Sequence, residues 1–86
     1  MKIDAFNFTI YDVENVHADL MVEFANNDAV NIDMGSVEKI DMAALQLLVS
    51  TKRSCKAEEK TFALNNVSDE VLGAIRMSGL ESELGV

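Results

Sequence analysis

The stretch from residue 30 to residue 48 constrains the fold most, because an alternating apolar run changes there into a helical pattern. The run predicts a strand with one buried face, made of Val30, Ile32 and Met34. A turn follows at Gly35–Ser36, and then a short extended piece at Val37–Ile40. Asp41 stands immediately before the helical pattern and suits its N-cap. Backbone N–H groups at a helix start lack partners within the helix, so we expect a functional surface there.

The rest of the chain repeats this alternation of strands and helices. Strands are predicted over residues 2–10 (with Phe6, Phe8 and Ile10 on one face), 29–34 and 61–65. Helices are predicted from Asp12 to the Asn26–Asp28 turn, from Asp41 to about Glu58 or Glu59, and from Ser68 to Gly79, before an acidic tail at 81–86. The pattern predicts an α/β fold, in which helices pack on an open, mostly parallel sheet of about four strands.

The chain length and the net charge limit the number of domains and the kinds of partner that we expect. The 86 residues predict a single domain, residues 1–86. The net charge of −8 disfavours nucleic acid as a partner, because phosphate contacts require clustered Lys and Arg. A neutral or basic protein surface is the more suitable partner. The chain shows no signal peptide and no apolar run near the ~18–20 residues that span a membrane, so we expect a cytoplasmic protein without membrane insertion.

The residue types that carry catalysis or bind metals are sparse. His17 and Cys55 are the single residues of their kinds, and we expect both to be structural. The four glycines form no phosphate-binding loop, and no Cys/His cluster predicts zinc. We therefore expect no catalytic residue, metal or cofactor. The basic residues Lys52, Arg53 and Lys56 are interpreted as a solvated helix face that suits the dipole.

Three pieces of the sequence resemble the STAS domain family (sulphate transporter and anti-sigma factor antagonist). The central piece is Asn31–Leu48, in which Ile-Asp-Met leads through Val-Glu-Lys-Ile-Asp into a leucine-rich helix. Lys60–Asn66 is similar to the next strand of the family, and Val71–Leu80 to its closing helix, which ends near a Gly-Leu pair. The resemblance implies a STAS-like fold and a protein–protein switch. In anti-sigma factor antagonists, a partner kinase phosphorylates a Ser or Thr at the start of the central helix and is thereby released.

The sequence departs from that pattern at the position of the hydroxyl. Met42 occupies the family's Ser/Thr position, so phosphorylation there is not expected, and Ala44 stands where the family has glycine. Asp33 and Asp41 match family acids; Asp41 either caps the central helix or contacts the partner directly. The resemblance predicts a partner-binding site composed of Asp33, Gly35, Ser36, Asp41, Met42, Ala43, Ala44 and Leu45.

Two functions from different classes follow. The leading hypothesis is a non-enzymatic STAS adaptor that docks on a histidine-kinase-like anti-sigma factor or on a related regulatory or chemotaxis protein. The alternative is a small STAS subunit of an ABC-type lipid transporter, which binds the cytoplasmic ATPase. A nucleotide-binding module is a third hypothesis, which the acidic charge and the missing phosphate loop disfavour. A homodimer is compatible with the sequence.

Overall fold

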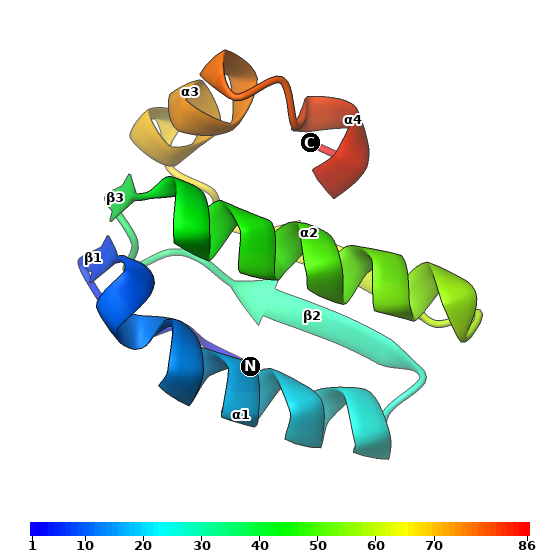
Figure 1. Cartoon of the computed structure of the whole chain (residues 1–86). Coiled ribbons are helices and arrows are strands. Elements are labelled where there is room, and N and C mark those ends of the chain that lie inside the picture. Colours follow the sequence, from blue (N-terminus) through cyan, green and yellow to red (C-terminus); the bar gives the residue numbers. More distant parts are fainter.

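The computed structural model describes residues 1–86, and strands alternate with helices along the chain as predicted (Figure 1). The elements are β1 (Asn7–Phe8), α1 (Ile10–Asn26), β2 (Ala29–Asp33), β3 (Lys39–Ile40), α2 (Met42–Ala57), β4 (Thr61–Asn65), α3 (Asp69–Met77) and α4 (Glu81–Leu84). The predicted bounds of the central helix agree closely with α2. No helix is both long enough and apolar enough to cross a bilayer.

All strand pairing is parallel, which confirms the predicted α/β class, but the strands form two small sheets. β2 pairs with β4 along its whole length, and β1 pairs with β3. Before β1, the N-terminal residues lie against the end of β2: the Ile3 N–H donates to the Asp33 carbonyl at 3.1 Å, and the Asp33 N–H donates to the Met1 carbonyl at 2.7 Å. α1 and α2 run side by side next to β2, and α4 contacts α2 (Figure 1).

The central helix supplies the largest share of the core. Its buried residues are Ala44, Leu45, Leu47, Leu48, Val49, Thr51 and Cys55. They pack with strand residues such as Val30 and Ile32, as the alternating pattern predicts. The buried Thr51 hydroxyl donates to the Leu47 carbonyl at 2.9 Å, so this polar group remains satisfied inside the core.

The strand predicted over residues 2–10 is shorter in the structure. Phe8 is buried, but β1 covers only two residues, and Phe6 and Ile10 are exposed. α1 begins at Ile10 because Thr9, not Asp12, is the N-cap. The Thr9 hydroxyl accepts from the Tyr11 N–H at 3.3 Å, and the Asp12 carboxylate accepts from the Thr9 N–H at 3.1 Å. This reciprocal capping box stops the strand before Ile10.

The C-terminal part confirms two predicted caps and adds one element. The Ser68 hydroxyl accepts from the Val71 N–H at 3.2 Å and starts α3. Gly79 ends that helix at a φ of 70°, and the Leu80 N–H returns to the Ile75 carbonyl at 3.1 Å, as in a Schellman motif. The acidic tail, for which no element was predicted, forms the short helix α4, whose Leu84 is buried.

Candidate interaction surface

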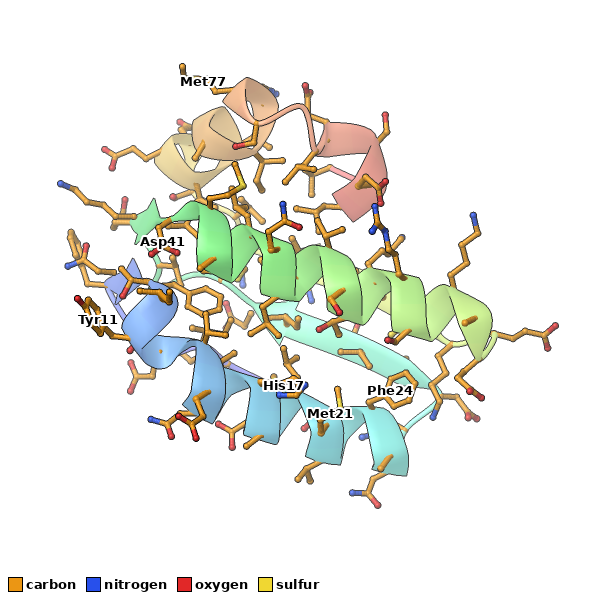
Figure 2. All side chains as sticks on the ribbon, viewed as in Figure 1. Tyr11, His17, Met21, Phe24, Asp41 and Met77 are labelled. Atoms are coloured by element: carbon orange, nitrogen blue, oxygen red, sulfur yellow. The ribbon has the colours of Figure 1, made fainter.

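Asp41 joins the starts of two helices. As the N-cap of α2, its Oδ1 accepts from the Ala44 N–H at 2.9 Å, which confirms the capping interpretation. Its Oδ2 accepts from the Ile10 N–H, the first backbone amide of α1, at 2.8 Å. Figure 2 shows Asp41 beside the beginning of α1. One carboxylate therefore satisfies unpaired N–H groups of both helices and fixes their N-termini next to each other.

Large apolar side chains lie exposed around this junction. The exposed fractions are 61% for Phe6, 61% for Ile10, 91% for Tyr11 and 52% for Met42. Their proximity follows from the backbone, since the Phe6 carbonyl accepts from two amides of the segment before Asp41, and Ile10 is bonded to Asp41 itself. We call Phe6, Ile10, Tyr11, Asp41 and Met42 the junction surface.

The predicted site at the start of α2 is only partly available to a partner. Met42 is exposed, and Ala43 is half-buried. Ala44 and Leu45, both predicted to bind the partner, lie in the core instead, because the inward face of the first turn packs against the strands. Phe6, Ile10 and Tyr11 were missed, because they belong to the surface only through the Asp41–Ile10 contact, which spans 31 residues.

Asp33, Gly35 and Ser36 form a separate turn. The Asp33 carboxylate accepts hydrogen bonds from within the chain. Asp33 Oδ1 accepts from the Gly35 N–H at 2.8 Å and from the Asn66 amide at 3.2 Å. These two hydrogen bonds, with attraction from Lys2, lower the pKa of Asp33 below its ordinary value of 3.8. A Cβ at Gly35 would lie 3.0 Å from that oxygen, so the glycine permits the close approach. Ser36 is half-buried in the same turn.

The single cysteine and the single histidine lie apart from the junction surface. Cys55 is fully buried in α2, and burial raises the pKa of its thiol, which confirms the expected core role. His17 is exposed on α1 (Figure 2). No three His, Cys, Asp or Glu side chains gather as metal ligands.

Parallel strands, covering helices and a junction at the start of the central helix define a small α/β domain of the STAS type. The chain belongs to the STAS domain family, since residues 7–85 match the family model described as "Mlab, STAS domain". The fold is similar to that of a sulfate transporter family protein from Wolinella succinogenes, whose crystal structure superposes with a TM-score of 0.83. The match has 24% sequence identity and covers 99% of this chain and 69% of the other. A search of curated proteins returned no match.

Proposed function

We propose that this chain is a non-enzymatic cytoplasmic protein-interaction module that docks through the junction surface. The observation that carries the proposal is that three segments meeting at Asp41 all expose large apolar side chains, namely Phe6, Ile10, Tyr11 and Met42. Several large apolar side chains exposed at one end of a molecule are typical of a protein-binding site. Tyr11 supplies a large amphipathic contact, and the flexible Met42 adapts to a partner's shape.

The charges near the patch indicate what the partner should offer. Asp12 and Glu14 lie in the first turns of α1, and Glu38 lies in the segment that hydrogen bonds to Phe6. Lys39 directly follows Glu38 in the sequence. The partner's face is therefore expected to be apolar at its centre and basic at its rim.

Met42 determines how the docking is controlled. The side chain lies at the first position of α2, where the family resemblance places a phosphorylated hydroxyl, and a thioether accepts no phosphate. Docking is therefore proposed to be independent of phosphorylation at this position. The partner would then be held constitutively rather than released by a kinase.

Two partner classes fit such a module. The first is a histidine-kinase-like anti-sigma factor or another regulatory or chemotaxis protein. The second is the cytoplasmic ATPase of an ABC-type lipid transporter, with this chain as a small STAS subunit. The name of the structural neighbour, a sulfate transporter family protein, supports a transport setting. The missing hydroxyl at Met42 weakens support for the first class, because the family's signalling role depends on it.

A pull-down from the source cell separates the classes. The natural chain serves as bait beside Met42→Asp and Met42→Ser. Recovery of a transport ATPase supports the subunit role, and recovery of a sensor kinase or anti-sigma factor supports the adaptor role; either should be lost with Met42→Asp. Phosphate on the Met42→Ser bait alone would show a partner kinase that still recognises the helix start. Equal recovery by the natural and Met42→Asp baits would contradict docking through the junction surface.

A further inference from the structure

The opposite end of α2 carries a concentration of positive charge. Four of the seven basic residues lie between positions 52 and 60, although the chain has a net charge of −8. Two adjacent surface hollows, of about 410 and 390 Å³, share Lys52 and Lys56 in their walls. Arg53 and the C-terminal residues Ser82 and Glu83 complete the first hollow. We call Lys52, Arg53 and Lys56 the basic ridge.

Local structure accounts for only part of this charge. The Lys60 ammonium donates to the Phe24 carbonyl at 2.6 Å and to the Asn27 carbonyl at 2.8 Å, so it closes the end of α1. Lys56 lies in the last turn of α2, where a cation suits the helix dipole.

Lys52 plays neither role, although its ammonium lies beside Gly85 at the end of α4, 3.7 Å from where a Cβ on that glycine would be. It precedes the last turn, where the effect of the dipole is small, and it makes no salt bridge. Its ammonium lies 5.7 Å from the centroid of the Phe62 ring, which is a weak attraction at an open surface. Lys52 and Lys56 are four residues apart on one helix and repel each other. Carboxylates from outside the chain would relieve that repulsion.

The structure already shows which chemistry this ridge accepts. α4 lies against α2, and its Glu83 carboxylate pairs with Arg53 at 3.1 Å, so a short acidic helical turn contacts one end of the ridge. No hydrophobic residue lines the first hollow, whereas small-molecule pockets are mostly apolar. Both features favour a carboxylate-bearing protein segment over an enclosed ligand.

We propose that the basic ridge docks an acidic segment of a protein partner, rich in Asp and Glu, with carboxylates on Lys52 and Lys56 beside the Arg53–Glu83 pair. Lys52 follows Met42 by ten helical residues, or about 15 Å of rise, so the ridge is a second contact, independent of the junction surface. A partner that engages both would gain from the linkage of the two contacts.

The probe for this proposal is a hexaglutamate peptide, titrated into the 15N-labelled chain and followed by amide NMR shifts. Parallel titrations use sodium chloride at matched ionic strength and inorganic phosphate. The test variant is Lys52→Gln/Lys56→Gln. The control, Lys2→Gln/Lys39→Gln, makes the same change in net charge elsewhere on the chain. A Lys52→Arg/Lys56→Arg variant preserves charge and serves as the rescue.

We expect saturable shifts at residues 52–56 and 82–83 with hexaglutamate. Affinity should fall about threefold to tenfold in the Gln variant, as expected for the loss of two exposed ion pairs. The control and the Arg variant should bind as the natural chain does. Three results would overturn the proposal: shifts that match sodium chloride, saturable binding that the Gln variant retains in full, or saturation by phosphate but not by hexaglutamate.

Discussion

At the scale of single residues, Asp41 does more than an ordinary N-cap. Each oxygen of its carboxylate accepts from the first turn of a different helix, at 2.9 Å for Ala44 and 2.8 Å for Ile10. Because both helix starts are partly positive, one negative side chain stabilises both. The same carboxylate holds Ile10 and Tyr11 beside Met42, so it supports the junction surface as well as the fold.

We predict that Asp41→Ala lowers the free energy of unfolding by about 2 kcal/mol, roughly twice the usual loss of about 1 kcal/mol for one N-cap. Ser68→Ala is the comparison; it removes the cap of α3 and the 3.3 Å bond from the same hydroxyl to the Val37 carbonyl. Asp41→Asn should also destabilise, because an amide offers only one oxygen to the two N–H groups. Urea denaturation followed by circular dichroism measures all three variants. If Asp41→Ala cost no more than about 1 kcal/mol, the usual loss for one N-cap, the bond to Ile10 would make no contribution.

Asp33 should contribute to the pH dependence of stability. Its pKa in the folded chain lies below the ordinary value of 3.8, mainly because the Gly35 N–H and the Asn66 amide bond to the ionised form. The stabilisation is therefore present above about pH 4 and is lost as the pH falls through the folded-state pKa. Between pH 5 and pH 3, the natural chain should lose more unfolding free energy than Asp33→Asn.

Urea titrations at several pH values test this prediction. Asp4→Asn is the matched control, because Asp4 is exposed and makes no hydrogen bond through its side chain in the structure. It should follow the natural chain closely. If the unfolding free energies of the natural chain and Asp33→Asn fell equally between pH 5 and pH 3, the role assigned to the Asp33–Gly35 turn would be contradicted.

At the scale of elements, α4 shows how tertiary packing creates a helix. Four residues are too few for a helix that is stable alone, and Leu80 provides no side-chain cap for it. The element exists because Leu84 is buried in the core and Glu83 reaches Arg53. The ion pair is exposed at both ends, so the buried leucine supplies most of the attachment.

Leu84→Ala is accordingly predicted to cost about 2–5 kcal/mol of unfolding free energy, the usual range for a truncated core leucine. Val86→Ala, two residues later and partly exposed, should change stability by less than about 0.5 kcal/mol. Thermal and urea unfolding compare the two directly. Similar losses for both variants would mean that α4 does not belong to the folded core.

The elements also show which features can be predicted from sequence. α2, β2 and β4 were predicted closely because their signals are local: an N-cap, a period of two or 3.6, and a terminal glycine. The N-terminal strand was predicted too long because Asp12 is also a suitable N-cap residue. In the structure Thr9 is the N-cap, and Asp12 is the N3 residue of its capping box. α4 was missed because its helical state depends on the core, which no local pattern records.

The candidate site was predicted less completely for the same reason. Asp41 and Met42 follow from the strand–turn–helix pattern. The burial of Ala44 and Leu45 depends on which side of the first turn meets the sheet. The contribution of Ile10 depends on a contact across 31 residues, which a single sequence without a fold does not specify.

At the scale of the whole molecule, α2 connects two surfaces of opposite character. Its start lies at an apolar, acid-rimmed junction, and its later turns carry the basic ridge. A partner could engage either surface alone, so the two proposals can fail separately. The central proposal is the one at the helix start, and exposed methionines on two elements provide a matched pair of variants to test it.

Met42→Asp and Met77→Asp make the same change at two exposed methionines, one inside the junction surface and one outside it. Met77 is 93% exposed and projects from α3, away from Asp41 (Figure 2). An acid at the start of α2 suits the helix dipole, whereas one at the end of α3 costs about 0.3–1 kcal/mol. The control variant is therefore expected to be the less stable of the two.

The most direct measurement is calorimetric titration of the purified partner with the natural chain and these two variants, each first shown to be folded by circular dichroism. We predict that Met42→Asp weakens binding at least about tenfold, as for an anchor residue that contributes more than about 1.4 kcal/mol. Met77→Asp should bind as the natural chain does. Equal affinity of all three proteins, or selective loss with Met77→Asp, would contradict docking through the junction surface.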